Sequence, residues 1–218
     1  IPLLLLPRPV FARCIRAWIH SIFFLQRRIL KLDFAFRGRE RLPEDAFILA
    51  SAHQSAWETI GFYALLDDPV YVLKKELYRI PMFGPYARKM GMIAIDRNGG
   101  AGAARNMIRA VAARLADGRP VVIFPGGTRS HPDEIVELKS GIGALYRQCG
   151  VPVVPVSLNS GVYWARRSFV KKPGTIVAEI GEPIPPGLDN AAFADLLSSR
   201  IHDGNRRLAE EARQALSG

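Results

Sequence analysis

The spacing of hydrophobic positions changes near residue 32. Between residues 10 and 32, apolar side chains recur every three or four positions, which is the period of an amphipathic α-helix. Beyond residue 32, short β-like runs alternate with helical stretches. Strands are predicted at residues 33–38, 46–51, 70–74, 92–96, 120–124, 152–158 and 175–180, and further helices at residues 56–66, 82–90, 101–116, 140–149 and 191–216.

This alternation predicts an α/β fold, in which a mixed, largely parallel sheet is covered by helices. The runs at 121–124 and 153–156 are apolar at almost every position and indicate buried central strands. Pro155 argues against a central place for the second run, because proline lacks the N–H that a ladder bond needs. We expect two parts, a membrane-associated N-terminal segment at residues 1–32 and an α/β domain at residues 33–218.

The N-terminal segment combines apolar and basic positions. Its first six residues are wholly apolar but fall far short of the roughly 20 that span a bilayer. Because the chain begins with Ile1, we expect them to continue a segment that starts upstream. The helix that follows carries aromatic and aliphatic residues on one face and basic residues, among them Arg13, Arg27 and Arg28, on the remainder. This pattern predicts an amphipathic helix in a membrane interface, and the alternative is a helix packed on its own domain.

Charge narrows the classes of partner. Thirty Lys and Arg against twenty Asp and Glu leave a net charge of +10, which is typical of proteins that meet nucleic acid, an anionic membrane or phosphorylated molecules. The basic residues are dispersed and form no nucleic-acid motif. The two cysteines, Cys14 and Cys149, are far apart, which excludes a disulfide framework and a cysteine-based zinc site.

The stretch from Ser51 to Glu58 lies between a predicted strand and a predicted helix, where active-site loops collect. On one continuous helix His53 and Glu58 would lie about 140° apart, so they meet only if His53 precedes the helix. Ser55 and Glu58 have the spacing of a capping box, which predicts a helix start at this point. Glu58 can therefore cap the helix or orient His53 as a general base, and a carboxylate with two oxygens can do both.

Other predicted strands also end in polar residues. Arg97 follows the strand at 92–96, and Lys74 ends the strand at 70–74. The strand at 120–124 continues into Pro-Gly-Gly-Thr-Arg-Ser, whose glycines allow backbone N–H groups to face an anion and whose Arg129 can hold a phosphate. The spacing is not that of a Walker loop. Taken singly, each segment also fits a tight turn with exposed basic side chains.

Taken together, these segments resemble the four motifs of the glycerolipid acyltransferase family. The first motif, H-x-x-x-x-D, is represented by His53 to Glu58, and the second, an arginine after an apolar strand, by Arg97. The third, F-P-E-G-T-R-S, is represented by residues 124–130, and the fourth, a Val-Pro-rich strand, by residues 151–156. The motifs occur in the family's order, and the resemblance extends from about residue 33 to residue 187.

Two positions depart from the family's pattern. Glu58 stands where the first motif has Asp, and Gly126 stands where the third has Glu. The extra methylene of Glu58 lengthens the reach of its carboxylate. Gly126 removes a carboxylate from the site, so a change in acceptor preference or a weaker activity is expected.

The resemblance implies direct acyl transfer from a thioester of coenzyme A or acyl carrier protein to the free hydroxyl of lysophosphatidic acid, which gives phosphatidic acid. His53 would act as general base, and Glu58 would orient it. The acceptor would be bound by Lys74, Arg97, Gly126, Gly127, Thr128 and Arg129. Backbone N–H groups near the two glycines would stabilise the oxyanion.

The resemblance further implies no metal and no cofactor beyond the acyl thioester. The expected partners are the lysolipid, the acyl donor and an anionic membrane surface, without nucleic acid. The expected location is the cytoplasmic face of the bacterial inner membrane. Three alternatives stay open: an acyltransferase for another lysolipid such as lyso-ornithine lipid, a thioester hydrolase, and a nonenzymatic basic membrane-binding module.

Overall fold

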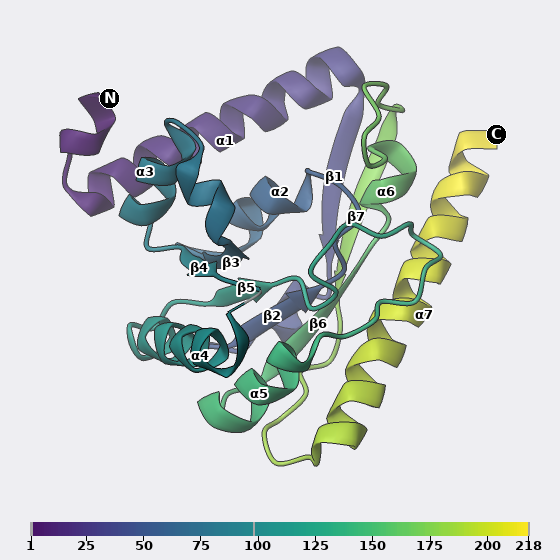
Figure 1. The fold of residues 1–218 in the computed structure, drawn as a ribbon. Coiled ribbons are helices and arrows are strands. Elements are labelled where there is room, and N and C mark those ends of the chain that lie inside the picture. Colours follow the sequence, from purple (N-terminus) through teal and green to yellow (C-terminus); the bar gives the residue numbers. More distant parts are fainter. Residues whose placement is uncertain (1, 98, 218) are drawn as a thin grey trace.

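The computed structural model describes residues 2–97 and 99–217 (Figure 1). Within them a seven-stranded sheet has the order β1-β7-β6-β2-β5-β3-β4. The strands are β1 (Leu32–Arg37), β2 (Ile48–Ser51), β3 (Val70–Lys74), β4 (Ile93–Ile95), β5 (Val121–Ile123), β6 (Val153–Leu158) and β7 (Gly174–Ile180). The α-helices are α1 (Arg8–Leu30), α2 (Glu58–Leu65), α3 (Phe83–Lys89), α4 (Gly100–Ala116), α5 (Ser140–Cys149), α6 (Ser160–Tyr163) and α7 (Asn190–Ser217). Short 3₁₀ helices are η1 (Pro2–Leu5), η2 (Arg39–Arg41) and η3 (Lys75–Arg79).

The sheet is mixed and largely parallel, as predicted. Each neighbouring pair of strands runs parallel except β6 and β7, which run antiparallel. The strands β6, β2, β5, β3 and β4 therefore share one direction, and their carboxyl ends lie along the same edge of the sheet. This edge is where ligand sites form in open α/β sheets.

Pro155 lies within the buried strand β6 despite its missing N–H. On the β7 side, β6 pairs from Val156 onward, and Val153 forms an isolated bridge with Ile184. Pro155 lies between these two pairings, where the ladder is interrupted, and its carbonyl accepts the N–H of Gly181 at 2.9 Å. The missing donor faces this interruption, so the sheet accommodates proline in a central strand.

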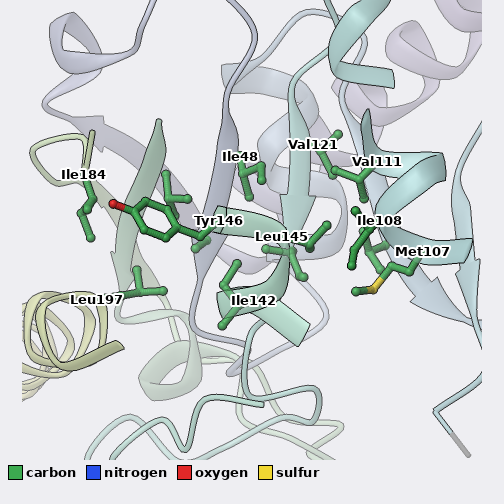
Figure 2. Packing of buried hydrophobic residues seen from close by; sticks show 14 of the residues in the cluster. Ile48, Met107, Ile108, Val111, Val121, Ile142, Leu145, Tyr146, Ile184 and Leu197 are labelled. Atoms are coloured by element: carbon green, nitrogen blue, oxygen red, sulfur yellow. The ribbon is translucent and has the colours of Figure 1, made fainter. Parts of the chain in front are cut away.

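Helices cover both faces of the sheet (Figure 1). On one face α4, α5 and the first half of α7 pack their apolar sides against the strands, and Figure 2 shows part of this core, with Ile48 and Val121 of the sheet facing Leu145 and Val111 of the helices. On the other face α1 and α2 enclose a second core around the fully buried Trp57. Burial on both faces explains why the central strands are apolar at nearly every position.

Helix α1 presents apolar residues to the domain and to the exterior. Phe11, Ile19 and Phe23 are buried against the sheet and its neighbouring helices. Trp18 and Ile29 point outward, with exposed fractions of 60% and 71%. Packing on the domain therefore accounts for one apolar face of this helix and leaves the outer one unexplained.

The remaining differences from the predicted elements are local. Helix α2 begins at Glu58 rather than at residue 56, because Ser55 Oγ accepts the N–H of Trp57 and residues 55–57 form a turn before the helix. The four-residue helix α6 was not predicted, since one turn has no measurable period. Among the described residues, no helix combines the length and the apolar character that crossing a bilayer requires.

Candidate active site

The predicted site residues gather at the carboxyl edge of the parallel strands. His53 follows β2, Arg97 follows β4, and the segment 124–130 follows β5. Two contacts join the first and third segments. The main-chain carbonyl of His53 accepts the N–H of Ser130 at 2.8 Å, and the His53 side-chain ring stacks on Phe124 with centroids 4.4 Å apart. The strand order thus places residues from distant parts of the sequence beside one another.

His53 and Glu58 are in direct contact. His53 Nδ1 lies 2.8 Å from Glu58 Oε1, with His53 in the loop before α2 and Glu58 at the first position of that helix. Glu58 Oε1 also accepts the backbone N–H groups of Gln54 at 2.6 Å and Ser55 at 2.7 Å. Because this oxygen is an acceptor for both, Nδ1 carries the hydrogen and Nε2 is the nitrogen able to take a proton.

The second oxygen of the Glu58 carboxylate is held by hydroxyl groups. Oε2 accepts a hydrogen bond from Ser160 Oγ at 2.9 Å and one from Ser55 Oγ at 3.2 Å. The Glu58 side chain is completely buried, and these donors offset the large free-energy cost of removing its charge from water. Glu58 therefore caps the chain before α2 and orients His53 at the same time.

Sequence reasoning missed two residues that support this pair. Ser160, at the start of α6, comes from the chain after β6 and reaches Glu58 across the sheet edge. Gln54 donates through Nε2 to the carbonyl of Leu158 at 2.9 Å and accepts the N–H of Gly161 at 3.0 Å. Both tie the His53 loop to the end of β6. The one available signal was the run of small polar residues after the Val-Pro strand.

Arg97 lies against the glycine turn of the third segment. A Cβ added at Gly127 would approach the Arg97 guanidinium to 3.4 Å at Cζ, and Gly127 has a φ of +72°. The positive φ makes glycine suited to this turn, while an added Cβ would only be in ordinary van der Waals contact with the guanidinium. Burial lowers the pKa of Arg97, and the carboxylate of Glu76 opposes this effect. Arginine remains charged under these conditions, so Arg97 places a fixed cation beside the turn.

The turn limits which N–H groups could stabilise an oxyanion. The N–H of Gly127 donates to the carbonyl of Phe124 at 2.9 Å and closes the turn. This N–H is therefore engaged within the protein and does not supply an oxyanion hole. Gly126 has ordinary backbone angles, and an added Cβ would lie 3.2 Å from Cγ1 of Val136, so a larger residue there requires a small shift of that side chain.

The other predicted binding residues occupy the rim of this region. Thr128 is exposed, and Arg129 is half-buried beside it. The carbonyl of Arg129 accepts a hydrogen bond from Nη1 of Arg166 at 3.0 Å. Lys74 is exposed at the carboxyl end of β3, which runs beside β4, the strand that leads to Arg97. Basic side chains therefore lie along this edge on the strand ends around the buried His53–Glu58 pair.

The chain is similar in sequence to several named acyltransferases. The chain is 34% identical over 167 residues to a 1-acyl-sn-glycerol-3-phosphate acyltransferase of Pseudomonas aeruginosa, an alignment that covers 77% of this chain and 65% of that protein. It is 30% identical over 198 residues to a protein of the same name from Bacillus subtilis, covering 82% of this chain and 94% of the relative. A lyso-ornithine lipid O-acyltransferase of Pseudomonas aeruginosa is 28% identical over 204 residues, covering 85% of this chain and 76% of that protein.

The fold is also found in a solved structure. The crystal structure of the 1-acyl-sn-glycerophosphate (LPA) acyltransferase of Thermotoga maritima superposes with a TM-score of 0.74 at 23% identity, covering 95% of this chain and 85% of the other. The family model described as Acyltransferase matches residues 33–159, which include His53, Glu58, Arg97 and the glycine turn. By this match and by its relatives, the chain belongs to the Acyltransferase family.

Proposed function

We propose that this protein transfers a fatty acyl group from an acyl thioester to the free hydroxyl of lysophosphatidic acid, forming phosphatidic acid. The observation that carries the proposal is the contact between His53 Nδ1 and the buried Glu58 carboxylate, which leaves Nε2 to act as a base. Two relatives named 1-acyl-sn-glycerol-3-phosphate acyltransferase, at 34% and 30% identity, support this acceptor.

The chemistry needs one proton transfer in each direction. As the acceptor hydroxyl oxygen attacks the thioester carbonyl carbon, its proton passes to Nε2 of His53. The buried Glu58 carboxylate stabilises the imidazolium that forms. When the C–S bond breaks, the leaving thiolate takes the proton from the imidazolium, and the ester product is complete. Holding both substrates in line supplies much of the remaining rate enhancement.

The acceptor phosphate is assigned to the basic rim. The Arg97 guanidinium lies beside Gly127, and Arg129 follows Gly127 by two residues in the same loop. Guanidinium groups suit a phosphate because they donate in a bidentate geometry. Lys74 adds a third positive charge at the neighbouring strand end.

We further assign the outer face of α1 to a membrane interface, where the lysolipid resides. This face carries exposed apolar residues next to Arg13 and Arg28, in keeping with an interfacial helix on an anionic lipid surface. Because acyl-CoA and acyl carrier protein are cytosolic donors, the site would face the cytoplasm. The choice between the two donors is left to the assay.

The test uses purified protein with detergent-dispersed lysophosphatidic acid and labelled acyl-CoA, repeated with acyl carrier protein as donor. We expect labelled phosphatidic acid from the parent and at least a hundredfold lower rate from His53→Ala, the range that general-base catalysis contributes. Equal rates for the parent and His53→Ala would refute the assigned base. Free fatty acid formed without any acceptor would identify a thioester hydrolase instead.

A second acceptor is favoured by one relative. The lyso-ornithine lipid O-acyltransferase aligns with 85% of this chain, and Gly126 departs from the family's third motif. Lyso-ornithine lipid has no phosphate, so its acylation should depend little on Arg97. Comparing the two acceptors with the parent and Arg97→Ala separates them: a loss confined to lysophosphatidic acid supports the phosphate role.

A further inference from the structure

The loop between α6 and β7, residues 164–173, carries apolar side chains at its tip. The side chain of Phe169 is fully exposed, at 101% of the reference value, and Val170 beside it is 74% exposed. Adjacent large apolar side chains exposed to water form an apolar patch, and such patches on a protein surface often mark interaction sites. Basic residues flank the tip on both sides: Arg166, Arg167, Lys171 and Lys172.

Polar contacts within the loop hold this tip outward. Lys171 Nζ donates to the carbonyls of Ser168 at 2.6 Å and Phe169 at 3.1 Å, and it lies over the Trp164 ring at 4.9 Å from its centroid. At the base, the N–H of Lys172 donates to the carbonyl of Tyr163 at 2.9 Å. These contacts engage several carbonyl and N–H groups of the loop, and the Phe169 side chain is left projecting from it.

The loop emerges beside the carboxyl end of α1 (Figure 1). Gly174, the first residue of β7, donates its N–H to the carbonyl of Lys31 at 2.9 Å and pairs with Leu32 of β1. The end of α1 nearest this point exposes Phe24 and Ile29. Arg27, Arg28 and Lys31 occupy the same part of the chain. The loop and the carboxyl half of α1 therefore expose the same combination of apolar and basic side chains next to one another.

We propose that the α6–β7 loop inserts Phe169 and Val170 into an anionic lipid surface, as a second membrane contact beside α1. An aromatic tip between cations matches a bilayer, because the apolar groups enter the acyl region while the cations stay at the phosphate level. Phe169 projects fully into solvent, which suits insertion into a deformable lipid surface, while Val170 keeps most of its surface exposed at the edge of a hollow between the loop and the end of α7. The inference rests on the proposed function only in taking the outer face of α1 as membrane-bound.

This contact bears on the site through one hydrogen bond. Arg166 lies in the loop, and its Nη1 donates to the carbonyl of Arg129 in the third segment. A loop seated in the lipid surface thus lies next to Arg129, one of the residues assigned to the acceptor phosphate. A lysolipid whose head group stays at the interface would reach this edge without leaving the membrane.

The test is partition of the purified protein onto vesicles of phosphatidylcholine with phosphatidylglycerol, measured by flotation. We expect Phe169→Ala to lower the partition coefficient about tenfold, because a buried phenyl ring contributes substantially to transfer. Phe169→Trp should bind at least as well as the parent, since tryptophan favours the interface. The control is Leu188→Ala, which removes a partly exposed leucine just before α7. The start of α7 lies at the end of the molecule opposite α1, so this variant should leave vesicle binding unchanged (Figure 1).

The outcomes are distinguishable. Vesicle binding of Phe169→Ala equal to that of the parent, with an unchanged melting temperature, would overturn the inference. Unchanged vesicle binding with a raised KM for acyl carrier protein would also overturn it and assign the loop to the acidic donor protein. If the parent shows no acyl transfer in detergent but its vesicle binding depends on Phe169, the proposed function fails and the membrane contact stands.

Discussion

Replacing Glu58 by glutamine separates the charge of this side chain from its hydrogen bonds. Glutamine has nearly the same shape and keeps one acceptor oxygen. With that oxygen in place of Oε1, it still accepts from His53 Nδ1 and from the backbone N–H groups of Gln54 and Ser55. The amide NH₂ then faces the hydroxyls of Ser55 and Ser160, which can rotate to accept from it. Glu58→Gln should therefore fold normally and lose only the negative charge.

The size of the effect follows from the geometry. With Nδ1 and Oε1 2.8 Å apart, the centres of the two charges lie about 4 Å apart, which corresponds to about 4 kcal/mol at an effective dielectric constant near 20. The amide dipole retains part of this stabilisation, so we expect a loss of about 2–4 kcal/mol at the transition state. That loss is a fall in kcat of roughly 30- to 1,000-fold.

Glu58→Ala is the matched comparison, because it removes the acceptors as well. It leaves buried backbone N–H groups and hydroxyls without a partner, each costing about 1–3 kcal/mol. We expect its melting temperature to fall steeply while that of Glu58→Gln stays near the parent value. The assay is kcat for acyl transfer in detergent beside thermal unfolding by circular dichroism. A folded Glu58→Gln protein with kcat within threefold of the parent would refute the assigned role of the charge.

Three further outcomes are expected. Gly127→Ala should lower the free energy of unfolding by about 1–2 kcal/mol, because its φ is +72°. Gly126→Glu should stay within about 1 kcal/mol of the parent in the same denaturant titration, and the reverse order would contradict the described turn. In steady-state kinetics in detergent, Arg97→Ala should raise KM for lysophosphatidic acid about tenfold or more, with a smaller change in kcat. An unchanged KM would mean that the phosphate binds elsewhere. The hydrogen bond from Arg37 lowers the pKa of Glu211, so this pair stabilises the fold above the ordinary carboxyl pKa, and its contribution disappears as the pH falls through the lowered value. Glu211→Gln should therefore lower the free energy of unfolding by less than about 1 kcal/mol at neutral pH and flatten the acid side of a plot of melting temperature against pH. An unchanged acid side of that plot would contradict this role of the pair.

The local pattern of residues was sufficient to predict most of the secondary structure of this protein. The period of apolar residues predicted the strands and long helices, because each face of an element meets a single environment. The spacing from Ser55 to Glu58 predicted a helix start that leaves His53 outside it, and the structure confirms that His53 and Glu58 meet. These features depend on residues at most five positions apart, so the neighbouring sequence determines them.

Contacts between distant segments required the tertiary structure. Ser160 reaches Glu58 across 102 positions, and Arg97 packs on Gly127 because β4 and β5 end at the same edge of the sheet. Strand order and register result from packing the whole sheet between its helices, and hydrophobic period carries no information on which strand lies beside which. The break in pairing that accommodates Pro155 has the same origin. The sequence alone therefore determined the elements and the histidine–carboxylate pair, while the assembly of the sheet decided which side chains surround that pair.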